Sequence, residues 1–396
     1  MNNYNILDSK LSVIERINKI IPLDETKKVI IFGIGYIGIH GILLLKKLGK
    51  KVSYIIDNDE SKVGSSYLGV EVKNPYELLY ENWDDVLVFI CAGGKRAQEM
   101  ADMLEGMGGV FNQNYFRVLS EERYEPANMI DPILGYSRGE RGFKEIVVSN
   151  QEMKLDEENE VKILVLGGST TDYSLYGIKS WSFFLKELLD KDGISNQVIN
   201  GGVCGYNSSQ EMLKLLGEGI DRINPDIVIS YSGFNDSCPS KYPLVHDNYV
   251  EVLETLWNCY KNNVGDIDDI YFGEMAYDSV IRYIKNMRIM HSVCEEFDIK
   301  FIGILQPTMV TGKCNIDETE REYLQIEAIK NKVNKSLEFY KVAKDKIKEF
   351  PWIWDFTSIF DGEEDCFYEW VHCNEKGNQI IANNIYKILE HIIKEQ

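Results

Sequence analysis

The sequence has few prolines, few basic residues for its size and no long apolar run. Of its 396 residues 9 are proline, and 43 Lys and Arg stand against 63 Asp and Glu, which gives a formal net charge of −20. Such a charge repels the phosphates of nucleic acids and of anionic membrane surfaces, so we expect neither as a partner. No stretch has the length of a membrane span, and the N-terminal segment lacks the apolar core of a signal peptide. We therefore expect a cytoplasmic protein that acts on a small molecule.

Cysteine is also scarce. The 8 cysteines are scattered, with no CxxC pair and no nearby histidine at the spacing of a zinc site. This pattern excludes a small disulfide scaffold and favours reduced, mostly buried thiols. We expect no metal, because the sequence shows no cluster of ligand residues.

Hydrophobic residues make up 44% of the chain, enough for more than one core. Apolar β-branched runs alternate with amphipathic stretches in two series, which predicts an α/β protein with two doubly wound, parallel-sheet domains, residues 1–125 and 126–396. We interpret an aromatic-rich insertion at about 237–298 as a helical subdomain or a subunit interface rather than as a lid that stacks on sugars. The sequence leaves open whether the chain forms a homo-oligomer.

Three glycines in the first series form a GxGxxG motif. Gly33, Gly35 and Gly38 follow the apolar run VIIF and precede an apolar helical stretch, and Asp57 ends the next expected strand. In a dinucleotide site such glycines let a pyrophosphate approach the helix N-terminus, and the acidic residue accepts from a ribose hydroxyl. The alternative is that the glycines only form a tight turn in a domain that binds nothing.

The first 120 residues resemble the Rossmann-like nucleotide-binding domains attached to bacterial sugar-modifying enzymes. The resemblance rests on this glycine motif and on the string IIDNDESKVGSSYLGVEV that follows the second expected strand. It implies a cofactor-binding site for a nucleotide, NAD(P) or a nucleotide-sugar. An oxidoreductase or epimerase would also need a catalytic Tyr/Lys pair or its equivalent, which we do not find.

In the second series Ser169 follows the apolar run ILVL and two glycines. At a strand end that enters a helix, backbone N–H groups face incoming negative charge, so a serine there can act as a nucleophile. The alternative is an ordinary helix N-cap.

Two further segments offer hydrogen-bond donors to such a site. Gly205 and Asn235 each follow an expected strand, and a glycine amide and an asparagine side chain can hold the negative oxygen of a tetrahedral intermediate. The alternative for both is a turn. His372 follows Glu369 by three residues, a spacing at which a carboxylate can orient an imidazole as general base.

The order Ser, Gly, Asn, then acid-x-x-His resembles the SGNH (GDSL-type) hydrolase superfamily over about residues 130–396, including the DPILGY…RGERGF lead-in. The resemblance implies a flavodoxin-like, three-layer α/β/α domain with Ser169 as nucleophile and His372 as base. It also implies an oxyanion hole made by the Ser169 and Gly205 amides and the Asn235 side chain. The α/β-hydrolase fold fits less well, because its GxSxG elbow would need a glycine where Thr171 stands.

Two departures from the superfamily pattern matter. The first segment reads GGST instead of GDS, with Gly168 in the position of the acid. Glu369 stands where Asp is usual, so it either orients His372 from a shifted backbone or leaves a Ser/His dyad. Asp365 is a less favourable substitute.

These features predict a serine esterase that removes O-acetyl or other short acyl groups from a carbohydrate or nucleotide-sugar through an acyl-enzyme. Ester hydrolysis needs no cofactor. An O-acyltransferase would use the same Ser/His site, with a sugar hydroxyl in place of water. A further alternative is a non-catalytic nucleotide-binding or scaffold protein.

Overall fold

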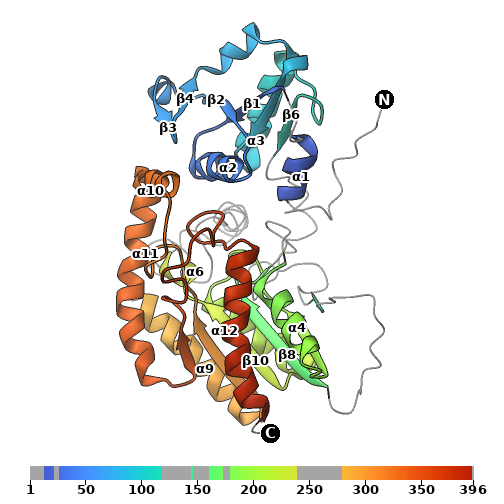
Figure 1. Cartoon of the computed structure of the whole chain (residues 1–396), viewed down its shortest axis with the longest axis vertical. Coiled ribbons are helices and arrows are strands. Elements are labelled where there is room, and N and C mark those ends of the chain that lie inside the picture. Colours follow the sequence, from blue (N-terminus) through green and yellow to red (C-terminus); the bar gives the residue numbers. More distant parts are fainter. Residues whose placement is uncertain are drawn as a thin grey trace, which may run out of the picture. The chain divides into compact units, whose positions relative to one another are not determined.

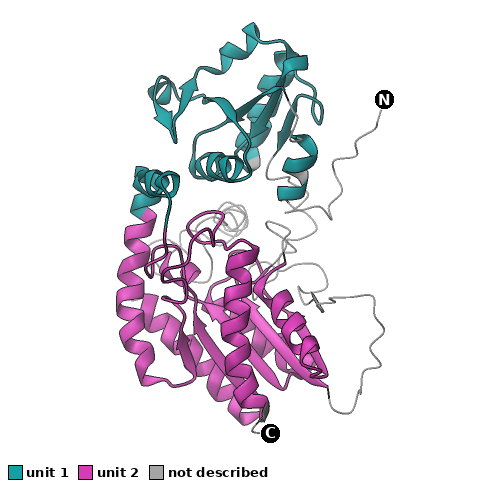
Figure 2. Cartoon of the chain, in the orientation of Figure 1, with its two compact units in different colours: residues 1–127, 316–331 teal, residues 128–315, 332–396 magenta. Residues whose placement is uncertain are grey.

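The computed structural model describes residues 13–21, 26–117, 144–145, 160–172, 179–238 and 279–394. The chain divides into two compact units (Figure 2): unit 1 comprises residues 1–127 and 316–331, and unit 2 comprises residues 128–315 and 332–396. The boundary expected at 125/126, the DPILGY…RGERGF lead-in and residues 239–278 of the expected insertion lie outside the described residues. Unit 1 takes in 316–331, which the sequence suggested would continue the second domain.

The described part of unit 1 is built on a six-stranded sheet of order β3-β4-β2-β1-β5-β6 (Figure 1), with every pair parallel except β3 and β4. The strands are β1 (Lys28–Phe32), β2 (Val52–Ile56), β3 (Ser66–Tyr67), β4 (Val70–Lys73), β5 (Val86–Ile90) and β6 (Tyr115–Arg117). The central strands read as near-continuous apolar runs because both faces are covered, as is typical of parallel sheets. The helices are α1 (Val13–Ile20), α2 (Tyr36–Lys47) and α3 (Gly94–Gly106), with single 3₁₀ turns at Glu60–Lys62, Pro75–Tyr80 and Trp83–Asp85.

Helix α10 (Glu318–Gln325), from the middle of the sequence of unit 2, packs on α2 of unit 1. Lys47 Nζ lies 2.5 Å from Glu320 Oε1, with only 15% and 4% of the two side chains exposed. The Tyr323 hydroxyl lies 3.2 Å from His40 Nε2. A buried ion pair of this kind costs several kcal/mol when one partner is removed, so α10 is an integral part of unit 1.

The described part of unit 2 is built on a second six-stranded sheet, of order β12-β11-β10-β8-β9-β7, with all pairs parallel except β7 and β9. Its strands are β7 (Lys144–Glu145), β8 (Val161–Gly167), β9 (Asn196–Asn200), β10 (Ile227–Ser232), β11 (Lys300–Leu305) and β12 (Ile353–Asp355). The chain leaves β8 for β9 on one side and then returns to β10 on the other. At such a switch point the carboxyl ends of neighbouring strands form the usual ligand crevice.

Helices cover both faces of this sheet. Leu164 and Val228 share one core with Tyr283 and Met287 of α9. Side chains alternate along a strand, so Tyr231, three residues after Val228 on β10, faces the other side of the sheet. There it packs against Trp181 of α4, and α4 contacts α12. The helices are α4 (Trp181–Lys191), α5 (Ser208–Lys214), a π-helix at Leu215–Ile223, α6 (Phe234–Ser237), α9 (Ser279–Glu296), α11 (Glu327–Lys346), a 3₁₀ turn at Ile347–Glu349 and α12 (Glu375–Lys394).

A carboxyl group is buried in the core between α5 and the sheet. Glu211 is 1% exposed and accepts a 2.6 Å hydrogen bond from the Ser230 hydroxyl. The pKa of this carboxyl is raised from its ordinary 4.5 to about 8. Burial is the main cause and the Asp236 charge adds to it, while hydrogen bonds from Ser230 and Ser232 and the Lys214 charge act in the opposite direction. Glu211 is therefore protonated in the folded protein at neutral pH.

Glu211→Gln is expected to flatten the pH dependence of stability. Below pH 4.5 the carboxyl is protonated in both states, whereas between 4.5 and 8 only the folded state keeps the proton. The free energy of unfolding therefore falls as pH rises through this window, by at most about 1.4 kcal/mol per pH unit from this group. Urea unfolding across the window measures the slope for wild type and variant.

The matched control is Glu349→Gln, whose side chain is 63% exposed. It should leave the slope of the wild type unchanged. An equal slope in wild type and Glu211→Gln would mean that Glu211 titrates normally in the folded protein.

Candidate active site

Ser169 lies in a tight turn at the carboxyl end of β8. The Gly168 carbonyl accepts hydrogen bonds from the Thr171 amide at 3.1 Å and the Asp172 amide at 2.9 Å. These two bonds close a turn over Gly168–Asp172, and the helix expected to follow Ser169 falls on residues 173–178, which lie outside the described residues. The turn holds the half-buried Ser169 side chain at the end of the strand.

Ser169, His372 and Glu369 form one line of polar contacts. Ser169 Oγ lies 2.6 Å from His372 Nε2, and Glu369 Oε1 contacts His372 Nδ1 on the far side of the ring. The same carboxylate accepts the His372 amide at 2.9 Å and the Val371 amide at 3.1 Å. The glutamate thus folds back onto its own loop, which accommodates its extra methylene at a spacing of three residues.

The loop that carries Glu369 and His372 is closed by its own backbone hydrogen bond and packs against Phe234 through Trp370. The Tyr368 amide donates to the His372 carbonyl at 2.8 Å, and the Met309 amide donates to the Trp370 carbonyl at 2.9 Å. The Trp370 ring is fully buried and meets Phe234 edge to face, with ring centroids 5.0 Å apart. These contacts hold the imidazole in one orientation. Asp365 lies exposed on the surface, seven residues earlier in the chain.

The segments with the expected oxyanion donors meet beside Ser169. Asn235 Nδ2 donates to the Tyr206 carbonyl at 2.7 Å, directly after Gly205. A Cβ atom on Gly168 would lie 2.3 Å from Asn235 Nδ2 and 2.9 Å from the Tyr206 carbonyl. Gly168 therefore has no room for a side chain, which gives a physical reason for the GGST sequence. Gly205 has φ of +82°, a conformation that favours glycine.

Two polar residues that the sequence did not single out fix the loop after β9. Asn200 Nδ2 donates to the Thr171 carbonyl at 2.8 Å, and Asn200 Oδ1 accepts the Gly202 backbone amide at 2.8 Å. Asp172 accepts the Cys204 amide at 3.1 Å. Both residues lie next to recognised motifs, but only the contacts across β8 and β9 give them a role.

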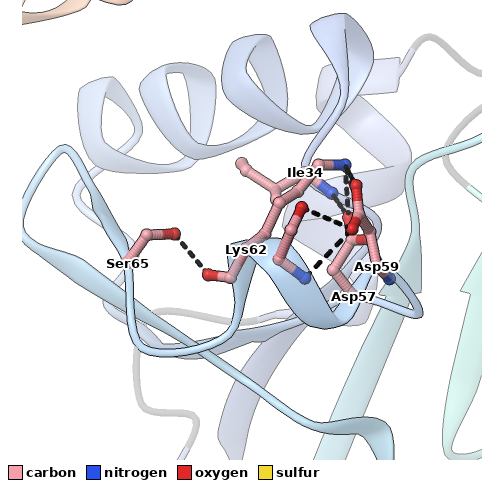
Figure 3. A network of polar contacts seen from close by, with 6 residues as sticks. Ile34, Asp57, Asp59, Lys62 and Ser65 are labelled. Carbon is pink, nitrogen blue, oxygen red and sulfur yellow. Dashed lines mark hydrogen bonds and ion pairs between the residues drawn. The ribbon is translucent and has the colours of Figure 1, made fainter.

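In unit 1 Asp57, which the sequence predicts at a nucleotide site, lies against Ile34 of the glycine loop (Figure 3). Asp57 Oδ2 accepts the Ile34 amide at 2.7 Å, within the glycine loop, and Oδ1 accepts the Asp59 amide at 2.9 Å. Lys62 Nζ lies 3.4 Å from the same carboxylate, and the Lys62 carbonyl accepts the Ser65 hydroxyl at 2.5 Å. The carboxylate thus ties the end of β2 to the glycine loop.

The three glycines have different surroundings. Gly33 has φ of +95°. A Cβ atom on Gly38 would lie 2.0 Å from the Gly33 carbonyl, whereas one on Gly35 would meet nothing within 4 Å. Gly35 precedes α2 without a side-chain cap. Gly38 is thus needed for packing, and Gly35 faces open space at a helix N-terminus, which can receive an anion.

Among the described residues, no group of three or more His, Cys, Asp or Glu side chains has the arrangement of a metal site. In the same part of the chain, no helix is both long and apolar enough to cross a membrane.

Residues 163–385 match the sequence model of the GDSL-like lipase/acylhydrolase family. The chain is similar to the acetyl xylan esterase AlAXEase, with 16% identity, 58% of this chain and 99% of that chain covered, and a TM-score of 0.32. For the psychrotrophic esterase EstA from Pseudoalteromonas sp. the identity is 14%, the coverage 59% and 100%, and the TM-score 0.35. For the lipase/acylhydrolase from Enterococcus faecalis these values are 17%, 58% and 96%, and 0.31. No curated protein is similar enough to count as a match.

Gly168→Ala is expected to slow the reaction of Ser169 with a serine-directed phosphonate by about 10²-fold. The added methyl group must displace the Asn235 side chain. If Asn235 is the expected oxyanion donor, the phosphonate oxygen then loses a hydrogen bond as it gains negative charge. Mass spectrometry of the adduct over time measures the rate.

Gly217→Ala is the matched control, because a Cβ atom there meets nothing within 4 Å. It should react at the wild-type rate. A wild-type rate for Gly168→Ala would contradict the close approach of Gly168 and Asn235.

Proposed function

The chain belongs to the GDSL-like lipase/acylhydrolase family, whose sequence model matches residues 163–385, and we propose that Ser169 is the nucleophile with which it cleaves an ester. As a member of this family, the protein is a hydrolase of carboxylic esters. The observation that carries the proposal is the 2.6 Å contact between Ser169 Oγ and His372 Nε2, with Glu369 on the other ring nitrogen. A serine hydroxyl needs such a base within hydrogen-bond reach to become nucleophilic.

In the proposed reaction, Ser169 Oγ attacks the ester carbonyl and His372 Nε2 takes its proton. The imidazolium then gives this proton to the leaving alcohol, which leaves an acyl-enzyme. Water repeats the two steps and releases the acid, with His372 as base and then as acid.

Glu369 completes a triad in this proposal rather than leaving a dyad. Its carboxylate faces the Nδ1–H and stabilises the imidazolium that forms during attack. Support comes from its burial, with 2% exposed, and from the two backbone amides that hold it.

The oxyanion hole would consist of the Ser169 and Gly205 amides and the second N–H of the Asn235 side chain. The first N–H of Asn235 is engaged by the Tyr206 carbonyl, which fixes the amide plane. Donors held in place before the reaction stabilise developing charge without reorganisation.

We propose an O-acetyl or other short acyl ester of a carbohydrate or nucleotide-sugar as the substrate. The AlAXEase structure is named as an acetyl xylan esterase, which is one precedent for such an ester. The same acyl-enzyme would serve an O-acyltransferase if a sugar hydroxyl replaced water.

For unit 1 we propose a Rossmann-like nucleotide-binding domain. Support comes from the order β4-β2-β1-β5-β6, from the glycine loop that joins β1 to α2, and from Asp57 at the end of β2. A nucleotide phosphate would lie at the open side of Gly35, on the N-terminus of α2.

Ser169→Ala is expected to lower kcat for 4-nitrophenyl acetate by about 10⁴-fold or more, because the acyl-enzyme cannot form. A phosphonate should label the wild type on Ser169 and leave the variant unlabelled. Ser195→Ala is the control, since the Ser195 hydroxyl has no partner within the described structure, and it should keep wild-type turnover.

Equal turnover in Ser169→Ala and wild type would overturn the proposed nucleophile. Turnover that rises strongly when a sugar alcohol is added, with the acyl group found on that alcohol, would favour the acyltransferase.

Gly35→Asp is expected to weaken nucleotide binding to unit 1 by more than about 10-fold while leaving the fold intact. The new side chain meets open space and makes a favourable N-cap, but its charge repels a phosphate. Calorimetry with NAD⁺ and a UDP-sugar measures the affinity, with Gly35→Ser as the neutral cap. If neither ligand binds to the wild type, this part of the proposal is contradicted.

A further inference from the structure

We propose that Asp236 is a positioning residue that holds the two oxyanion donors of unit 2 in register. This inference rests on the proposed function, because Asn235 and Gly205 are oxyanion donors only if Ser169 attacks an ester. Asp236 directly follows Asn235, and its side chain binds Ser208, at the end of the segment that carries the other donor.

The carboxylate of Asp236 is fully buried and binds the beginning of α5. It accepts the Ser208 amide at 3.1 Å and the Ser208 hydroxyl at 2.5 Å, and also the Ser232 hydroxyl at 3.2 Å. Ser208 is three residues after Gly205. A side chain of the Asn235 segment is therefore bonded to the far end of the Gly205 segment.

A second bond joins the same two segments. Asn235 Nδ2 donates to the Tyr206 carbonyl at 2.7 Å. Two adjacent residues thus bind the Gly205–Ser208 segment at two points. One bond would allow this segment to pivot about it, whereas two bonds fix both its distance and its orientation relative to the Asn235 amide.

Ser208 is itself held from the other side. Asn286 Nδ2 of α9 donates to the Ser208 hydroxyl and to the Ser209 hydroxyl, each at 2.9 Å. The Asn207 side chain caps α5 by accepting the Ser209 amide at 3.0 Å. Asp236 therefore binds a helix start that is itself held in place. This bond fixes the Asn235 segment relative to α5.

A carboxylate matches this contact better than an amide. The Ser208 amide, the Ser208 hydroxyl and the Ser232 hydroxyl all donate to Asp236. An asparagine side chain has one acceptor oxygen, so its NH₂ group would face at least one of these groups, and a hydroxyl there would have to turn and accept instead of donating. Because the site is buried, neither group could turn to water instead.

Asp236→Asn is the decisive variant, assayed with 4-nitrophenyl acetate. We expect kcat to fall about 10-fold to 100-fold with KM changed less than about 2-fold, because the donors act on the transition state rather than on the bound ester. Glu349→Gln is the control, since it removes the charge of an exposed carboxyl of unit 2 that pairs with Lys346. It should keep kcat within about 3-fold of wild type near pH 7.

A double-mutant cycle separates positioning from general structural support. If Asp236 acts through the oxyanion donors, Asp236→Asn should lower kcat by a much smaller factor in an Asn235→Ala background than in the wild type. The same factor in both backgrounds, or an unchanged kcat in Asp236→Asn, would overturn the proposal. Should Asp236→Asn not fold, Ser208→Ala removes one of the two donors, and an unchanged kcat there would overturn it equally.

The failure of the proposed function gives a different result. In that case Ser169→Ala retains the wild-type kcat, and both proposals fall together. If activity depends on Ser169 but the cycle shows no coupling, only the role of Asp236 is lost.

Discussion

The close approach of three chain segments at the carboxyl end of β8 is the constraint on which the site of unit 2 depends. Gly168 lies so near the Asn235 amide and the Tyr206 carbonyl that a methyl group does not fit. This proximity places Ser169 beside Asn235 and the Gly205 segment, where the oxyanion donors are proposed. It also explains why the motif contains a second glycine instead of an acid. The parallel sheet supplies the approach, because its neighbouring strands all end at one edge.

Much of the site could be predicted from local patterns. Ser169, Gly205, Asn235 and His372 each follow an expected strand or precede an expected helix, and their order carries the resemblance. The reach of Glu369 could not be predicted, because it depends on backbone amides that the carboxylate accepts within its own loop. The turn at Ser169 likewise depends on two amides that donate to the Gly168 carbonyl, and the helix expected after it stays a prediction.

Periodicity predicted two parallel-sheet units but not where every helix packs. The α10 sequence has an amphipathic face that would suit either sheet, and only its contacts assign it to unit 1. Asn200, Asp172 and Asp236 were likewise invisible as positioning groups. Polar residues beside glycines are common in turns, and their importance here arises from partners in other loops and at the start of α5, 28 to 32 residues away in the chain.

The two halves of the Ser169–His372 contact are 203 residues apart in the sequence. A ribosome that adds about 5 to 20 residues per second makes the serine roughly 10 to 40 s before the histidine. During that interval the growing chain carries the serine without the imidazole that contacts it. Glu369 and His372, by contrast, are made almost together on one loop, so Ser169 gains the whole line of contacts in a single late step of synthesis.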